Sequence, residues 1–380
     1  MIKFGWRYSL LYPSLFILFI LLRRLVKIFL EVKNKKFSFL MIFLLFVFET
    51  IIGIICLCYQ QRKNSSIGTS KFMGITFNKN NNYILNRPDS NFKIIILIFF
   101  ASYFQIVGAI SRRFIKNTTN ADEKDKKDIY DEFHAKYRSC EIIISSILCY
   151  FTLQNKIYRH HFFSLIIIMI CLIIVFLSGI LFNENELLLK NILITIISSF
   201  CRAFLDTIEK YLFSIDFIDI FKLIIFEGII DLIFLSSLFF FPKPQNELNQ
   251  LFKETKINQY LIVGLLIIYA ILSGFKNVYR RYTVKEFTPM TRALAESIID
   301  PFLIIYGFIQ NDFNNMPDFI ITLICSIIMV FCSCVYNEIF VLYCCGLEHN
   351  THLGVVNKTM EFELSYKSTI KSDTSEHSIL

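Results

Sequence analysis

The stretch LIIFEGIIDLIFL, residues 223–235, places two acidic side chains inside a run that is otherwise Leu, Ile, Phe and one Gly. Glu227 and Asp231 are four residues apart, so both side chains lie on one face of a helix. A charged side chain at the centre of a membrane-spanning helix costs about 2.5 to 3.5 kcal/mol on insertion scales. The stretch therefore predicts a membrane helix whose acidic face borders a protein interior or a polar cavity.

The composition of the whole chain supports a membrane setting. Of its 380 residues, 55% are hydrophobic and 18% are charged, and the mean hydropathy is +0.54. A membrane-spanning helix needs about 20 mostly apolar residues, and ten such runs predict an all-α polytopic membrane protein with ten transmembrane helices. The runs lie near residues 5–22, 37–59, 93–110, 138–153, 162–182, 187–206, 217–241, 258–276, 290–310 and 318–345.

The polar segments and the charge balance indicate the surroundings of these helices. Two polar loops are expected at 60–92 and 111–136, and the polar tail at 346–380 is expected to be disordered. The formal net charge is +8, and Lys and Arg beside membrane helices normally orient the chain and contact lipid headgroups. We therefore expect the lipid bilayer, and no nucleic acid, as the partner of these charges.

Two sequence pairs indicate an internal repeat. FETIIGII at 48–55 in the second run matches FEGIIDLI at 226–233 in the seventh, and Arg138 with Glu141 in the fourth run matches Arg292 with Glu296 in the ninth. Both offsets are five helices, and five crossings reverse the side on which the second unit begins. The sequence predicts two inverted five-helix repeats, at 1–182 and 183–345. The alternative is chance similarity between Ile-rich segments.

Ionisable side chains recur in the later runs at helical spacing. Glu296 and Asp300 repeat the i, i+4 arrangement of the opening stretch, and Arg202 and Asp206 form a third such pair. The arginines of this set are the expected counter-ions of its carboxylates. The candidate residues of a substrate pathway are Glu49, Arg138, Glu141, Arg202, Asp206, Glu227, Asp231, Arg292, Glu296 and Asp300.

Two other interpretations of these charges stay open. The charges can pair with one another simply to fix helix packing, or some can lie at the level of the headgroups, as expected for Arg138 and Lys210. Pro301 is expected to kink the ninth helix directly after Asp300, because proline has no backbone N–H to donate. A kink beside acidic groups suits a substrate site.

Three stretches resemble one known family of membrane proteins. YRSCEIIISSILCYFTLQNKIYRHHFFSLIIIMICLIIV (137–175), SSFCRAFLDTIEKYLFSIDFIDIFKLIIFEGIIDLIF (198–234) and TPMTRALAESIIDPFLIIYGFI (288–309) are similar to helices of the drug/metabolite transporter superfamily. The likeness is closest to the EamA-like solute carriers related to nucleotide-sugar transporters. It implies ten helices in two inverted repeats and a central cavity with alternating access.

The resemblance also implies which residues line the cavity. By position they are Arg138, Glu141, Arg292 and Glu296. Several relatives place a Lys deep in the fourth or ninth helix against an anionic substrate. This chain has no Lys there, which argues against phosphorylated substrates.

The favoured function is a secondary transporter that moves a small polar metabolite across an internal or plasma membrane. The alternative is a non-transporting scaffold or receptor built on the same fold. An endomembrane location, in the Golgi, the ER or vesicles, is expected, and a homodimer stays open. No enzyme activity, cofactor or metal is expected, because His160-His161 lacks an acyltransferase signature, the eleven Cys show no ligand spacing and no Gly-rich phosphate loop occurs.

Overall fold

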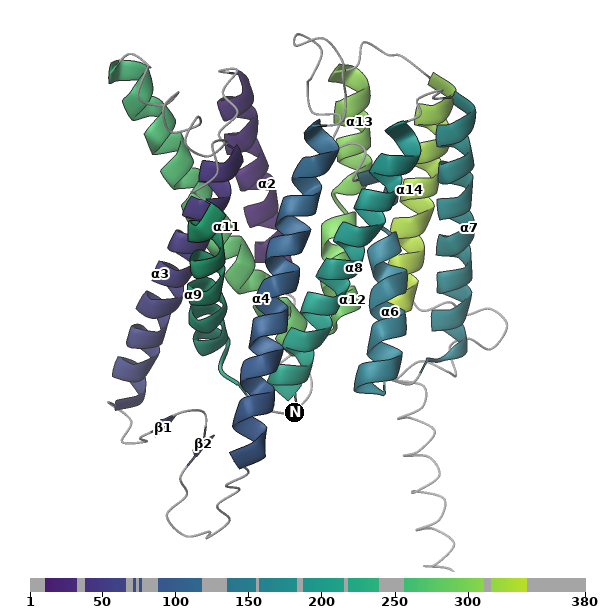
Figure 1. Cartoon of the computed structure of the whole chain (residues 1–380). Coiled ribbons are helices and arrows are strands. Elements are labelled where there is room, and N and C mark those ends of the chain that lie inside the picture. Colours follow the sequence, from purple (N-terminus) through teal and green to yellow (C-terminus); the bar gives the residue numbers. More distant parts are fainter. Residues whose placement is uncertain are drawn as a thin grey trace, which may run out of the picture.

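The computed structural model of the chain describes residues 11–32, 38–65, 71–72, 75–76, 88–117, 135–154, 157–182, 187–214, 218–238, 256–310 and 316–339 (Figure 1). Its helices are α2 (Leu11–Val32), α3 (Ser38–Ser65), α4 (Pro88–Asn117), α6 (Cys140–Leu153), α7 (Arg159–Phe182), α8 (Leu187–Ser214), α9 (Ile220–Leu238), α11 (Lys256–Glu286), α12 (Pro289–Ser297), α13 (Asp300–Gln310) and α14 (Met316–Tyr336). Two strands of two residues each, β1 (Lys71–Phe72) and β2 (Ile75–Thr76), pair antiparallel. The α-helical class is confirmed.

Six of the described helices are long and apolar enough to cross a bilayer. Their crossing segments are Leu40–Arg62, Phe92–Ser111, Arg159–Phe182, Asn191–Ser214, Tyr260–Glu286 and Met316–Tyr336. In Figure 1, α4, α8, α14 and α7 run in a similar direction, whereas α3 and α11 are tilted in opposite senses. Several apolar helices of this length are compatible with a multi-pass membrane protein.

Several helices extend beyond the apolar runs that predicted them. α2 continues past Arg23 and Arg24 to Val32, and α11 continues ten residues past the expected end at 276. The polar loop expected at 60–92 is shorter at both ends, because α3 continues to Ser65 and α4 begins at Pro88. Lys, Arg, Gln and Glu are good helix formers, so a charged residue ends an apolar run without ending the helix. The tail at 346–380 lies outside the described residues.

The ninth predicted run is broken into two helices. α12 begins after Thr288, whose side chain accepts a hydrogen bond from the N–H of Thr291 at 3.2 Å. Between α12 and α13 the chain makes a turn, in which the N–H of Ile299 donates to Glu296 O at 3.2 Å. Pro301 has no backbone N–H to donate to the preceding turn, which favours a break at this place. The sequence predicts a kink directly after Asp300, whereas the observed break lies just before Asp300.

Charged side chains are buried between the described helices, while many large apolar side chains are exposed on the outside. On the described part of α7 and α14 most exposed side chains are large hydrophobics, including Leu181 at 74% and Phe331 at 47% exposure. Carboxylates and guanidinium groups, by contrast, are buried between the central helices, with Glu227 and Arg281 both at 0%. A bilayer reverses the usual arrangement, because lipid favours apolar surface and polar groups must find partners within the protein.

The matched motifs of the second and seventh runs lie against each other where α3 crosses α9. Gly53 in α3 faces Ile224, and a Cβ on Gly53 would lie 2.8 Å from the Cγ2 of Ile224. Gly228 in α9 faces Thr50, and a Cβ there would overlap the Thr50 hydroxyl and lie 3.2 Å from its Cβ. The two glycines let the helices approach closely, which brings Glu49 toward α9.

Replacing Gly228 by Ala is expected to destabilise this crossing by about 1 to 3 kcal/mol, the usual range for inserting a methyl group into a packed contact. The matched control is Gly264→Ala in α11, because a Cβ there meets nothing within 4 Å. Alanine at that position should leave the stability unchanged or raise it slightly. Thermal unfolding in detergent measures both variants, and equal melting temperatures would contradict the close approach. Adding Thr50→Ala to Gly228→Ala should restore part of the loss.

Candidate functional site: a buried network of ion pairs

Arg281 is the centre of the first part of the site. Its guanidinium is fully buried in α11 and pairs with Glu49 of α3 and Glu227 of α9. Its Nε lies 3.1 Å from Glu209 of α8. Asn277, one helical turn earlier, donates through Nδ2 to the second oxygen of Glu49 at 2.6 Å. One arginine therefore joins four helices, and the two carboxylates from the matched motifs meet on it.

Arg280 continues the contacts along α8. It pairs with Asp206 and, at 2.5 Å, with Glu209. Because Asp206 and Glu209 lie three residues apart, they share one face of α8, and Arg280 and Arg281 cover that face together. Asp206 also pairs with Arg292 of α12, so the contacts pass from α11 through α8 to the broken helix.

Glu296 is the centre of the second part of the site. Its carboxylate lies 2.6 Å from Arg202 of α8, 3.6 Å from Arg292 of α12 and 3.9 Å from Lys276 of α11. Glu141 of α6 pairs with Arg292 and lies 3.9 Å from Arg202. Glu296 stands one residue before the end of α12, so three cations converge where this helix breaks.

Arg138 extends the site across the break. Its Nη1 donates to the backbone oxygen of Glu296 at 3.1 Å and lies 2.9 Å from Asp300. The Arg138 side chain is 7% exposed. The residue sits in the turn that leads into α6, and its side chain projects into the protein. Its expected depth at the level of the headgroups stays a prediction.

Asp231 differs from the other carboxylates of the site. It is fully buried, and among the described residues it has neither a hydrogen bond nor an ion pair, whereas Asp300, which also lacks a hydrogen bond, pairs with Arg138. It follows Glu227 by one helical turn. A buried polar group without a partner is uncommon, so Asp231 is a candidate for binding a substrate or a coupling ion.

These ion pairs define a network that we call the central network. It holds nine of the ten residues predicted from the sequence, with Asp231 beside them. Its cations are Arg138, Arg202, Lys276, Arg280, Arg281 and Arg292, and its carboxylates are Glu49, Glu141, Asp206, Glu209, Glu227, Glu296 and Asp300. Removing charges from water costs several kcal/mol each, so such a network is weak evidence for stability and stronger evidence for a role.

The cations of α11 are functional residues that the sequence pattern did not predict. The pattern indicated arginines of other helices as counter-ions, whereas Glu49 and Glu227 pair with Arg281, and Asp206 pairs with Arg280 as well as Arg292. The predicted apolar run ends at 276, so Arg280 and Arg281 lie outside it. Apolar residues such as Val278 and Val284 continue to alternate with the charges up to Glu286, and that pattern could have revealed the helix.

Two further polar contacts lie outside the central network. Lys210 Nζ donates to the backbone oxygens of Lys285 at 2.8 Å and Phe287 at 2.6 Å, where a cation suits the carboxyl end of a helix. Lys136 pairs with Asp318 of α14 at 2.9 Å, and Ser178 of α7 donates to the same carboxylate at 2.7 Å.

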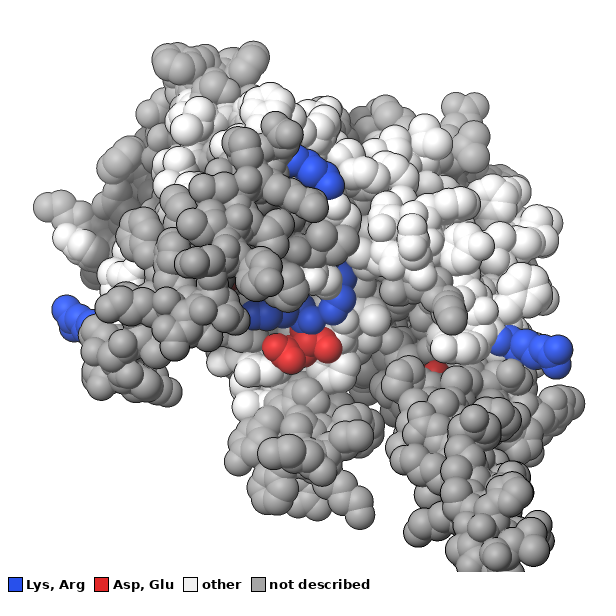
Figure 2. Space-filling model, turned by 90° about the horizontal axis from the view of Figure 1, so that it is seen from below, with Lys and Arg blue, Asp and Glu red and all other residues white. Residues whose placement is uncertain are grey.

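Charged side chains of both signs also reach the surface. Figure 2 shows Lys or Arg and Asp or Glu side chains gathered near the middle of the face seen from below.

Comparison with models of known protein families gives no match, and no curated protein matches the chain either.

Proposed function

We propose that this protein is a secondary transporter that moves a small polar metabolite by alternating access, on ten transmembrane helices in two inverted repeats. The resemblance to the drug/metabolite transporter superfamily favours this class. The observation that carries the proposal is the central network itself. Ionisable groups within membrane segments mark substrate or ion pathways by default, and here they gather at a broken helix, as in many transporters.

The packing of the helices supports the repeat. The repeat relates α2 to α8, α3 to α9, α4 to α11, α6 to α12–α13, and α7 to α14. If the two repeats are equivalent, each contact between two helices should recur between their counterparts. The contact of α4 with α8 recurs as α11 with α2, and that of α3 with α11 recurs as α9 with α4. The contact of α6 with α8 recurs as α12 with α2. The pairs α3 with α9, α6 with α12, and α7 with α14 map onto themselves and are also in contact.

One departure from this symmetry supports alternating access. α11 contacts α8, α9 and α12, whereas within the described residues its counterpart α4 contacts α2, α3 and α6 less than this or not at all. The ion pairs of Arg280 and Arg281 join α11 to α8 and α9. In the proposed mechanism these pairs close one side of the pathway. Opening that side requires α11 to separate from α8, and substrate binding shifts the balance between the two arrangements.

Within this pathway we assign substrate contact to the second part of the network. Arg202 keeps 14% of its side chain exposed, the largest fraction among the cations of the central network, and Lys276 lies 3.9 Å from the same Glu296 carboxylate. Arg281, by contrast, is fully buried. A polar substrate can therefore compete for Glu296, Arg202 and Lys276, while Arg281 holds the helices. From the resemblance we also propose an endomembrane location.

Uptake into proteoliposomes tests the proposal. Purified protein would be reconstituted and screened with labelled amino acids, cationic metabolites and nucleotide sugars, with protein-free liposomes as the control. Saturable uptake of one class above the control supports the transporter. Absence of uptake and exchange for every class, by protein that remains folded, would contradict it.

A non-transporting scaffold or receptor is the second candidate, and the dense pairing of the network favours it, since paired charges can serve helix packing alone. Access to Lys276→Cys separates the two. A transporter should let a membrane-impermeant thiol reagent reach this position from one side. In a scaffold the position should stay protected from both sides, as the buried Cys201 does, and the parent protein measures background labelling of its own thiols.

Asp231→Asn tests whether the carboxylate without a hydrogen bond serves function or structure. The amide has nearly the same shape and carries no charge, so removing a buried unpaired charge should leave the melting temperature unchanged or raise it. Transport should fall at least about tenfold if the carboxylate binds substrate or a coupling ion, equivalent to about 1.4 kcal/mol. A lower melting temperature with unchanged transport would assign Asp231 a structural role.

A further inference from the structure

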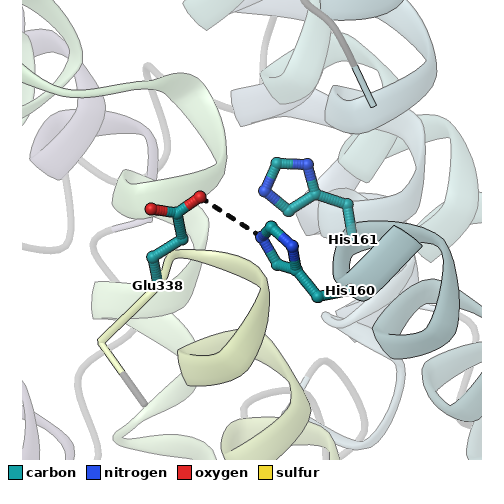
Figure 3. A group of neighbouring side chains, drawn as sticks. All are labelled: His160, His161 and Glu338. Carbon is teal, nitrogen blue, oxygen red and sulfur yellow. Dashed lines mark ion pairs between the residues drawn. The ribbon is translucent and has the colours of Figure 1, made fainter. Parts of the chain in front are cut away.

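His160, His161 and Glu338 form a group of side chains outside the central network. The two histidines open α7, and Glu338 follows the last turn of α14, the helix that packs along α7. In Figure 3 the carboxylate and the two imidazole rings face a common space. Residues 178 positions apart in the sequence are therefore brought together at the ends of two neighbouring helices.

The distances fit a transition-metal site. One ligand atom from each of the three residues lies within 4.8 Å of the others, and His160 Nε2 is 3.3 Å from Glu338 Oε1. Around tetrahedral Zn²⁺, ligands at about 2.0 to 2.2 Å stand about 3.4 Å from one another. One edge of the site already has this length, and rotation of the His161 side chain can close the others.

The local structure places His160 and Glu338 against each other, and His161 is the residue whose side chain must rotate to complete the site. His160 is 3% exposed, and neither of its ring nitrogens makes a hydrogen bond to a described residue. His161 stacks on Tyr336 with 4.5 Å between ring centroids. Glu338 has a φ of 57°, a left-handed conformation that favours Gly or Asn at the end of a helix. A glutamate is unfavourable there, and its conformation turns the carboxylate toward His160.

We infer that these three residues, which we call the His-His-Glu site, bind a divalent transition metal, with Zn²⁺ the best fit. Two imidazoles and one carboxylate are a typical zinc ligand set that leaves a fourth position for water, whereas Mg²⁺ and Ca²⁺ prefer all-oxygen sites. The N–H of Tyr158 donates to His161 Nδ1 at 3.3 Å. If the metal binds His161 Nδ1, it replaces this long hydrogen bond. If it binds Nε2, the ring proton moves to Nδ1, which then no longer accepts from Tyr158. The bound metal would fasten the end of α14 to the start of α7.

Metal titration of the purified full chain tests the site. The protein would be prepared without a histidine tag and treated with EDTA, and then titrated with ZnCl₂ or MgCl₂ while thermal unfolding is followed. Zn²⁺ is expected to bind at one equivalent and to raise the melting temperature, and Mg²⁺ is not. Co²⁺ in place of Zn²⁺ should give the visible absorption of a tetrahedral complex.

Variants locate the metal within the chain. His160→Gln, His161→Gln and Glu338→Gln should each weaken Zn²⁺ binding at least about tenfold, and Glu338→His should keep it, because three histidines also bind zinc. The control is the double variant His349→Gln and His352→Gln, whose positions lie outside the described residues. The site is rejected if the parent binds no Zn²⁺ at one equivalent, or if the control abolishes binding while the three Gln variants retain it. Binding can be measured on EDTA-treated protein even where a variant melts earlier.

Discussion

Arg281→Gln is expected to cause the greatest loss of stability among single substitutions in the central network. The variant leaves Glu49, Glu209 and Glu227 buried around a neutral side chain. Removing one partner of a buried ion pair costs about 3 to 5 kcal/mol, and the whole stability of a typical protein is only about 5 to 15 kcal/mol. We expect little monodisperse protein after detergent extraction, and a strongly lowered melting temperature for what remains.

Neutralising the stranded carboxylates should restore the fold. In the triple variant Arg281→Gln, Glu49→Gln and Glu227→Gln, only Glu209 keeps its charge, and Arg280 still pairs with it. The charges are then balanced, so most of the lost stability should return. Arg159→Gln is the control, because Arg159 is exposed at the start of α7. If Arg281→Gln melted like the parent, or if the triple variant were no more stable than the single one, the pairing described for Arg281 would be wrong.

Glu296→Gln is expected to have the greatest effect on transport. The amide keeps the shape of the side chain but removes the negative charge that faces Arg202, Lys276 and Arg292. Arg292 retains Glu141 and Asp206 as partners, so the protein should still fold. If substrate exchanges with these ion pairs, uptake should fall by about tenfold to a hundredfold, equivalent to about 1.4 to 2.7 kcal/mol.

The measurement is initial uptake into proteoliposomes of whichever substrate class the parent transports, normalised to folded protein. Glu286→Gln is the matched control, because Glu286 is exposed at the end of α11. It should transport like the parent. Parental uptake by Glu296→Gln, with an unchanged dependence on pH, would show that the carboxylate only supports helix packing, and would favour the scaffold.

The central network shows how far the sequence could predict the site. Glu227 and Glu296 were identifiable because a carboxylate within an apolar run has few acceptable environments. Arg281 was not identifiable, because it follows the apolar run. A charge after the end of such a run is typical of an interfacial residue or a loop. Its burial depends on α3, α8 and α9 approaching α11 from residues far away in the sequence, which no local pattern encodes.

The His-His-Glu site also depends on a contact between distant segments that the sequence does not predict. The adjacent histidines were visible in the sequence, but two histidines beside a basic residue at a helix end carry no information about a third ligand. Glu338 lies two residues after the end of α14 at Tyr336, whereas the sequence predicts that the apolar run continues to 345. Only the packing of α14 along α7 brings this carboxylate to within 3.3 Å of His160.

The sequence by itself therefore determined the helical membrane class and the carboxylates that cannot face lipid. Both follow from the cost of placing polar groups in hydrocarbon, which acts on each segment alone. The tertiary structure alone decided the partners of those carboxylates, the break before Asp300 and the association of α11 with α8 and α9. The reason is physical: the energy of a buried charge depends on the atoms within a few ångströms of it, and these come from helices distant in the chain.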